Sequence, residues 1–264
     1  MLTDTHAHLD FPQLYGDLAG VIQRACAAGV TRIITIGTSA AGSRRSLAIA
    51  EEHEGVFCAV GVHPNNVSEE PTGYVDAMRE LAVSLRVVAL GEMGLDYHYL
   101  PSTRGGSSEE DAAEKAAQAV AFRAQLDLAV DLGMPVIVHE RDSWADTLGI
   151  LRDYTGRVRA VFHCFGKSPE HARELVALGH TVSFTGIVTF KNAAEAQASA
   201  RELPVTFVET DSPYLAPVPH RGKVCEPAYV RHTAEFIAGL RGISLEQFAS
   251  ESEAAANCFF RFPK

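Results

Sequence analysis

The stretch Asp4-Thr5-His6-Ala7-His8 lies near the start of the chain, at the end of a short extended segment. Side chains of a strand alternate between its two sides, so His6 and His8 point to the same side and can chelate one ion. An isolated pair of this kind more often combines a core histidine with a surface histidine. Partners elsewhere in the chain decide between these interpretations, and the fold determines which residues can reach the pair.

Seven further short apolar segments follow and alternate with amphipathic helical segments. The expected strands cover residues 32–37, 56–61, 87–91, 135–138, 159–162, 181–184 and 205–208. Eight strands that alternate with helices, with no linker and no internal repeat, predict a parallel (β/α)8 TIM barrel that forms one domain over residues 1–264. An open doubly wound sheet is the alternative, and the strand count favours the barrel.

The connecting segments contain several helix boundaries. Ser107 and Glu110 form a capping box that starts a long helix, and Gly133 ends it. A helix is also expected over residues 74–85, and two closing helices occupy the C-terminal part of the chain. The polar segment 95–108 is long for a barrel connection, which favours a functional loop over a tight turn.

Composition and charge exclude several classes of protein. The formal net charge of −10 is opposite to the basic face that a protein gripping long duplex nucleic acid needs. The five cysteines are scattered and contain no C-x-x-C pair, which argues against a disulfide framework and a structural zinc site. No apolar run of about 18 residues and no signal-peptide pattern is present, so a cytoplasmic location is expected.

Residues with metal-binding side chains stand directly after six of the expected strands, where barrel active sites are built. They are His6, His8, His63, Glu92, His139, His163 and Asp211. Each residue alone would more often be structural. Their joint position at the strand ends predicts a metal site.

The size of this set predicts two divalent metal ions. Even without His63, its four other imidazoles and two carboxylates are more than one tetrahedral ion needs, and Glu92, near the middle, can bridge two ions. Imidazole-rich coordination favours zinc or manganese, while carboxylate and water ligands also suit magnesium.

Eight short motifs are spread over the whole chain. They are Asp4-Thr5-His6-Ala7-His8-Leu9-Asp10, Gly61-Val62-His63-Pro64, Gly91-Glu92-Met93-Gly94-Leu95-Asp96-Tyr97, Val138-His139, Arg141-Asp142, Phe162-His163-Cys164-Phe165, Glu209-Thr210-Asp211-Ser212-Pro213-Tyr214-Leu215 and Pro219-His220-Arg221-Gly222-Lys223. Together they resemble the successive signatures of the TatD family of metal-dependent deoxyribonucleases.

This resemblance implies a (β/α)8 barrel of the amidohydrolase superfamily. The implied ligands are His6, His8 and Asp211 for one ion, His139 and His163 for the other, and Glu92 as the bridge between them. The resemblance also implies hydrolysis of phosphodiester bonds, often as a 3′ to 5′ exonuclease on single-stranded or damaged DNA. DNA is then the expected partner, and no obligate protein partner is implied.

Three departures from the family pattern concern substrate preference. Cys225 stands where the family usually has Asn, Glu140 replaces a small or polar residue, and the stretch 104–114 is longer than usual. The ligand set is intact. Glu140 adds a negative charge near the expected phosphate site, which weakens anion binding unless the side chain points away or pairs with Arg141.

The expected mechanism uses a water molecule that two cations make acidic. Asp211 is expected to orient this water and accept its proton, and Glu92 is expected to act as the catalytic bridge. Further contacts to the substrate are expected from Arg141, Arg221, Lys223 and His63, with Tyr97 and His98 stacking on a terminal base.

Two other functions fit parts of the same pattern. A dinuclear site can also cleave an ester or amide, such as an aminoacyl-tRNA ester or a small lactone, and the net acidity of the chain slightly favours such a substrate. A barrel that has lost catalysis and serves as a binding protein is a third hypothesis. The complete ligand set argues against it.

Overall fold

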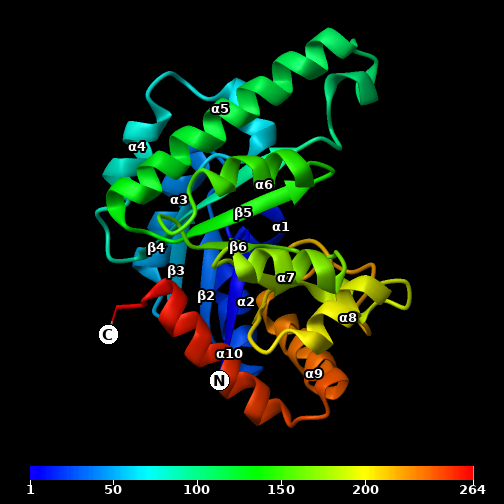
Figure 1. Cartoon of the computed structure of the whole chain (residues 1–264). Helices are drawn as coiled ribbons and strands as arrows, with labels where there is room; N and C mark the ends of the chain where they lie inside the picture. Colours follow the sequence, from blue (N-terminus) through cyan, green and yellow to red (C-terminus); the bar gives the residue numbers. More distant parts are fainter. Residues whose placement is uncertain (264) are drawn as a thin grey trace.

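The computed structural model describes residues 1–263. It contains one sheet of eight parallel strands, which are neighbours in the order in which they follow along the chain (Figure 1). The strands are β1 (Leu2–Ala7), β2 (Val30–Ile36), β3 (Val56–Val60), β4 (Val87–Asp96), β5 (Val136–Arg141), β6 (Ala160–Phe162), β7 (Thr181–Phe184) and β8 (Phe207–Val208). Each strand pairs with the next in parallel. The predicted (β/α)8 barrel is confirmed.

The segment that follows β8 closes the barrel against β1, which excludes the open sheet. Ala7 forms a parallel bridge with Ser212. Deeper in this seam, the fully buried carboxylate of Asp4 accepts hydrogen bonds from the backbone N–H and the hydroxyl of Thr210 at 2.9 and 2.6 Å.

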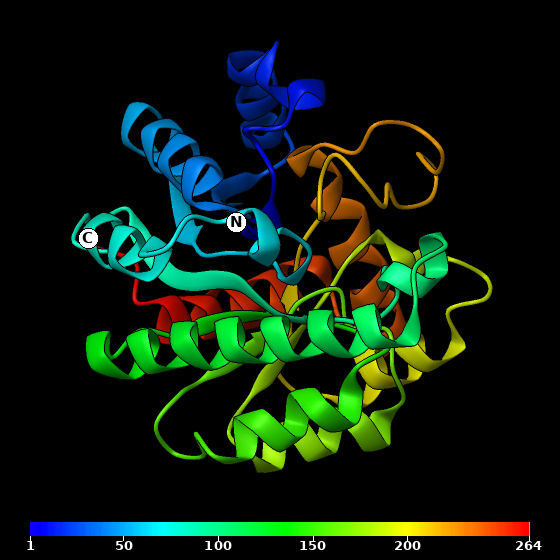
Figure 2. The same ribbon diagram turned by 90° about the horizontal axis from the view of Figure 1, so that it is seen from above.

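Helices surround the strands, as the view from above shows (Figure 2). The α-helices are α1 (Pro12–Tyr15), α2 (Leu18–Ala27), α3 (Ala40–Glu52), α4 (Tyr74–Leu81), α5 (Ser108–Leu132), α6 (Trp144–Arg152), α7 (Pro169–Ala177), α8 (Ala194–Glu202), α9 (Val230–Arg241) and α10 (Leu245–Phe260). Short 3₁₀ helices are η1 (Pro64–Glu69), η2 (Pro101–Arg104), η3 (Gly186–Thr189) and η4 (Pro227–Tyr229). The capping box of Ser107 and Glu110 and the left-handed Gly133 end cap bound α5 as predicted.

Several element boundaries differ from the sequence-based expectation, among them those of β8, α4 and β4. The strand β8 starts at Phe207, because Val205 is 49% exposed and the hydroxyl of Thr206 accepts a bond from Arg241. The helix α4 ends at Leu81, and Leu85 is exposed beyond it. The strand β4 continues to Asp96 because its residues from Met93 to Asp96 keep pairing with β5.

A buried apolar cluster fills the barrel interior and is closed at one end by α10. It contains Ile34, Ile36, Phe57, Ala59, Val88, Ala89, Ile137, Val161 and Phe207 from the strands, with Ala256, Phe259 and Phe260 from α10. In Figure 1, α10 lies beside the N-terminus, where the strands begin. Because this end of the barrel is plugged, a site for chemistry is left at the opposite end, where the strands finish.

The alternation of strand side chains carries polar residues to that opposite end. Ile137 and Val161 belong to the interior cluster, and the next residue on the same side of each strand is a histidine, His139 after Ile137 and His163 after Val161. Glu209 follows Phe207 in the same way. The ligand-type residues are therefore the top layer of the barrel interior.

Within residues 1–263, no helix combines the length and the apolar character needed to cross a membrane. All five cysteines are free thiols, as expected from their scattered spacing.

Candidate metal centre

The carboxylate of Glu92 lies at the centre of the polar residues that gather at the open end of the barrel. The residue is 2% exposed. Its Oε2 faces β1, with the Nε2 atoms of His6 and His8 at 3.4 and 4.0 Å. The Oδ1 of Asp211 completes this half of the cluster, 3.6 Å from the same atom of His6 and 3.2 Å from that of His8.

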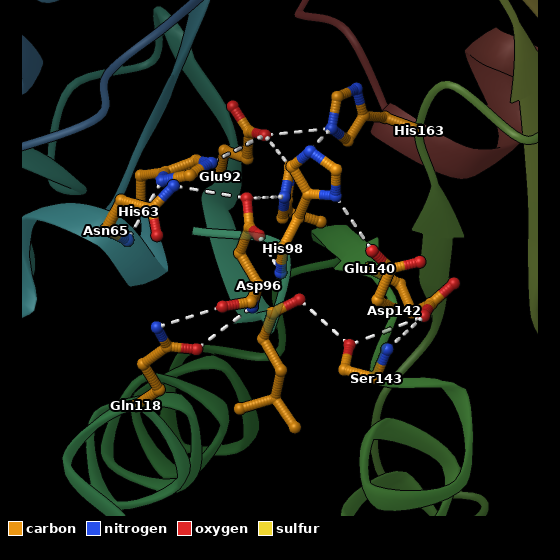
Figure 3. A network of polar contacts seen from close by, with 12 residues as sticks. His63, Asn65, Glu92, Asp96, His98, Gln118, Glu140, Asp142, Ser143 and His163 are labelled. Atoms are coloured by element: carbon orange, nitrogen blue, oxygen red, sulfur yellow. Dashed lines mark hydrogen bonds and ion pairs between the residues drawn. The ribbon is translucent and has the colours of Figure 1, made fainter. Parts of the chain in front are cut away.

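The other oxygen of Glu92 faces a second group of imidazoles. Its Oε1 lies 2.8 Å from Nε2 of His163 and 2.9 Å from Nδ1 of His139, and these two nitrogens are 3.2 Å apart. His63, which follows β3, lies at the edge of this half, with its Nε2 3.7 Å from the same oxygen. Figure 3 shows Glu92 directed toward His63 and His163.

A shift in strand register brings Glu92 to the barrel interior. Ala89 belongs to the interior cluster, and strict alternation would place Gly91 and Met93 on the same side of β4. Instead the pairing with β5 shifts between Leu90 and Met93, and Met93 packs in the outer core between strands and helices. Irregularities of this kind re-aim side chains next to functional sites.

The barrel seam places Asp211 beside the two histidines of β1. The Asp211 N–H donates to the His6 carbonyl, and the His8 N–H donates to the Ser212 carbonyl, both at 2.8 Å. Asp211 has a φ of 55°, a left-handed conformation that Asp adopts more readily than most residues. Backbone pairing between the first and last parts of the barrel therefore brings these three side chains together.

The distances around His6, His8 and Asp211 fit residues that share a cation. Nε2 of His6 is buried without a hydrogen-bond partner among the described residues, although a carboxylate oxygen lies 3.4 Å away. Two atoms bound at about 2.1 Å to one tetrahedral ion lie about 3.4 Å apart. Buried nitrogens are normally satisfied, and a metal ion would satisfy this one. Histidine and carboxylate donors are the ligand types of zinc and manganese.

The charges of the cluster also suit metal binding. Burial by itself raises the pKa of Glu92, but the attraction of His163, His6 and His63 and a hydrogen bond from His139 outweigh it and hold the pKa well below its usual range. Burial lowers the pKa of His163, but Glu92 and Glu209 outweigh burial and raise it well above its usual value. The carboxylate is thus ionised, and a bound cation would replace protons on the imidazoles.

Two buried carboxylates that the sequence reasoning gave no role stand behind the histidines. Oδ2 of Asp96 lies 3.1 Å from Nε2 of His139, and the backbone of Asp96 is held by the side chain of Gln118 (Figure 3). Oε1 of Glu209 lies 3.6 Å from Nδ1 of His163. Carboxylates in this position orient metal-binding imidazoles. Both lie in the quoted motifs, and Glu209 directly follows β8, which is the signal that could have identified it.

The substitution Asp96→Asn is expected to weaken metal binding by about 10-fold to 100-fold while leaving the fold intact. Burial opposes ionisation of Asp96, but its hydrogen bond and attraction to His139 prevail and lower its pKa to about 2, so the lost group is a charged partner. Asn keeps the oxygen that accepts the bond from the His98 N–H. Metal affinity would be measured by chelator competition.

The matched control for this prediction is Asp146→Asn. Asp146 accepts a hydrogen bond from the Tyr97 hydroxyl at 2.8 Å and lies on α6. Unchanged affinity in Asp96→Asn, or an equal loss in Asp146→Asn, would show that Asp96 does not support metal binding through His139.

The residues predicted to contact substrate are more dispersed than the ligands. The guanidinium of Arg141 lies over the ring of Tyr99 at 4.9 Å, and that of Arg221 over Phe190 at 4.4 Å. Lys223 is exposed in the segment after β8. Of this predicted group, the structure brings only His63 into ion-pair distance of a predicted ligand, Glu92.

The predicted stacking residues of the loop after β4 contact neighbouring elements. The hydroxyl of Tyr97 donates to Asp146, and its ring lies beneath the Lys115 ammonium at 4.5 Å. His98 is exposed, with its Nδ1 2.9 Å from a carboxylate oxygen of Asp142. Stacking of either ring on a base remains a prediction, and these contacts tie the loop to α5, α6 and the residue that follows β5.

The departures at Glu140 and Cys225 are accommodated inside the protein. Glu140 pairs with Lys167 at 3.2 Å rather than with Arg141, and it accepts a hydrogen bond from the Ser143 N–H at 2.8 Å. Lys167, a cation that the sequence reasoning did not single out, thus offsets the extra charge. Cys225 is fully buried, and its N–H donates to the carbonyl of Pro213.

Comparison with known proteins identifies the family. The family model described as TatD related DNase matches residues 3–261. The chain is 41% identical over 254 residues to the uncharacterized metal-dependent hydrolase YcfH of Escherichia coli (strain K12), covering 94% of this chain and 91% of the relative. It is 32% identical over 270 residues to a protein of Erwinia billingiae named 3′-5′ ssDNA/RNA exonuclease TatD, covering 98% and 99%.

A solved structure shows the same architecture. The crystal structure of YJJV, a TatD homolog from Escherichia coli K12, matches with a TM-score of 0.86 and 27% sequence identity, covering 99% of this chain and 98% of that one. The similarity therefore extends over the whole barrel, including every strand end that contributes to the cluster. The chain belongs to the TatD family of metal-dependent hydrolases.

Proposed function

We propose that the protein hydrolyses phosphodiester bonds of DNA as a 3′ to 5′ exonuclease that acts on single strands or ends and uses two divalent ions, zinc, manganese or magnesium. The observation that carries this proposal is the position of Glu92 between two groups of side chains. One of its carboxylate oxygens faces His6 and the other faces His163. A carboxylate placed in this way bridges two cations.

The two proposed ion sites use different parts of the cluster. One site consists of His6, His8, Asp211 and Oε2 of Glu92, and the other of His139, His163 and Oε1 of Glu92. Groups of three potential ligands lie within 4.8 Å in both halves. The first site is supported by Nε2 of His6, which has no hydrogen-bond partner among the described residues. The second is supported by the carboxylates of Asp96 and Glu209, which lie behind its two imidazoles and can orient them.

When bound, two divalent cations lower the pKa of a water molecule and offset the charge on the phosphoryl oxygens. Asp211 is the proposed proton acceptor. Its side chain is 15% exposed, whereas His6 and Glu92 are 0% and 3% exposed, so its carboxylate is the one in its half that faces the opening. Glu92 and His6, which are more deeply buried, would hold the ion beneath Asp211. His63 lies at the edge of the cluster and is the proposed contact to the phosphate.

The proposed substrate rests on the family and on charge. The matching family is described as DNase-related, and one relative carries the name of a single-strand exonuclease. With a net charge of −10, binding relies on local cations, for which we propose Arg141, Arg221 and Lys223, with Tyr97 near the strand end. Single strands and ends suit this arrangement because they need no extended basic surface.

The decisive test is hydrolysis of 5′-labelled single-stranded DNA by protein reconstituted with zinc, manganese or magnesium. Trimming that proceeds stepwise from the 3′ end is expected, with EDTA treatment and the His6→Ala variant abolishing it. If no divalent metal supports cleavage, the nuclease proposal is wrong. Turnover of a carboxylic ester or lactone under the same conditions would then favour the ester or amide hydrolase.

A further inference from the structure

A cleft of about 600 Å³ opens beside the metal centre, and none of the roles assigned above uses it. Its size lies within the range of small-molecule sites. The residues that line it are Asp10, Phe11, Pro12, Gln13, Arg45 and Tyr214.

Backbone hydrogen bonds tie the two aromatic residues of this cleft to two of the proposed metal ligands. The Phe11 N–H donates to the His8 carbonyl at 3.2 Å, and the Tyr214 N–H donates to the Asp211 carbonyl at 2.9 Å. The side chains of His8 and Asp211 in turn lie 3.2 Å apart. Each ring therefore follows a ligand by three residues, and the cleft adjoins the half of the cluster that contains the proposed proton acceptor.

The two rings form a corner that suits a flat aromatic group. Phe11 stacks on the His8 ring with centroids 4.7 Å apart and a tilt of 23°. Tyr214 stands nearly perpendicular to Phe11, at 83° and 6.1 Å, and is 49% exposed. A flat ring placed parallel to one of them meets the other edge to face, and both arrangements are favourable for aromatic pairs.

A guanidinium completes the cleft. Nε and Nη2 of Arg45 donate to Oδ2 of Asp10 at 3.2 and 3.0 Å, and the Asp10 side chain is only 3% exposed. This buried carboxylate holds the guanidinium in place. Arg45 is half exposed, and the remaining N–H groups of its fork are available to a phosphate.

We propose that this cleft binds a nucleotide next to the scissile phosphate, with Phe11 and Tyr214 stacking on its base and Arg45 contacting an adjacent phosphate. The proposal rests on the nuclease function proposed above and names the part of the substrate that this protein grips by its base. Stacking is indifferent to the identity of the base, so the subsite provides affinity without sequence preference.

The test compares single-stranded oligonucleotides that carry either a normal base or an abasic residue at each of the two positions flanking the first scissile bond. Wild-type protein is expected to lose about 10-fold in kcat/KM when one of these positions is abasic, which corresponds to the stacking of one base. Phe11→Leu and Tyr214→Leu are expected to slow cleavage of the normal substrate by about 10-fold and to leave the abasic substrate unchanged.

This comparison separates base binding from a structural role for the rings. If Phe11 only positioned His8, Phe11→Leu would slow both substrates equally. Phe11→Tyr and Tyr214→Phe keep a ring and are expected to keep the preference for a base. Tyr15→Leu is the matched control, because Tyr15 is exposed at the end of α1, the short helix that follows Phe11, and does not line the cleft.

The role of Arg45 is tested by binding without turnover. Binding of fluorescein-labelled single-stranded DNA would be measured by anisotropy at several salt concentrations, using metal-loaded Asp211→Asn protein, which is expected to keep its metal and hydrolyse the strand slowly, with and without Arg45→Gln. The substitution is expected to weaken normal and abasic strands equally and to reduce the salt slope by about one. An unchanged slope would remove Arg45 from the subsite.

The outcomes distinguish this proposal from the function on which it rests. Cleavage of normal and abasic strands at equal rates, unaffected by Phe11→Leu, leaves the nuclease standing and overturns the base subsite. No cleavage of either strand by wild-type protein overturns the nuclease and the subsite with it.

Discussion

Asp211→Asn is expected to reduce hydrolysis by about 10²-fold to 10⁴-fold, because it removes the group proposed to accept the proton of the attacking water. Asn keeps the shape of the side chain and tolerates the left-handed φ of 55°, so the seam is expected to stay intact. His6, His8 and Glu92 remain as donors in this half, and much of the metal content is expected to remain. The measurements are kcat under saturating metal and metal content by elemental analysis.

Asp131→Asn is the matched control for this experiment. Asp131 pairs with Arg79 in the outer layer, where it lies at the end of α5. It should retain wild-type turnover. Near wild-type turnover in Asp211→Asn would remove Asp211 from the chemistry, and loss of all metal would show that it acts as a ligand alone.

Glu92→Gln is expected to lower the metal content from two ions to one or none and to reduce hydrolysis by about 10³-fold or more. The amide has a single oxygen and no charge, so it cannot bind both ions at once. The side chain volume is nearly unchanged, which keeps the packing of the barrel interior. Elemental analysis and kcat measured on the same sample show whether ions and activity are lost together.

Glu253→Gln provides the control at the opposite end of the barrel. Glu253 accepts a hydrogen bond from Thr3 and pairs with Arg32, close to the start of the strands. Its substitution is expected to leave metal content and kcat unchanged. Wild-type protein that holds no more than one tightly bound ion under saturating metal would contradict the two-ion proposal.

Much of the fold was predictable because the hydrophobic pattern is local. The apolar runs that became β2, β3, β5, β6 and β7 have the short length of buried parallel strands. The capping box at Ser107 marked the start of α5 from its own chemistry. The predicted start of β8 was wrong, because Val205 is apolar yet exposed. The packing of the neighbouring strand decides where pairing starts.

The roles of Asp96 and Glu209 could not be predicted from any local pattern. Asp96 was read as part of a motif, but its role depends on the imidazole of His139, which belongs to the adjacent strand. Glu209 contacts His163, far from it in sequence. Such contacts join residues that no local pattern relates, so sequence reasoning from one chain left them without a role.

The sequence by itself determined the barrel and the kinds of residues at its open end, since strand periodicity and side-chain chemistry are written residue by residue. The tertiary structure alone decided how these residues divide. The register shift in β4 turns Glu92 inward with one oxygen toward each group of ligands, and the seam sets Asp211 against His6 and His8. The tertiary structure also brings Phe11 and Tyr214 together around one cleft. The reason is physical, because these arrangements depend on hydrogen bonds and packing between segments that can be more than 200 residues apart, which form only when the barrel closes.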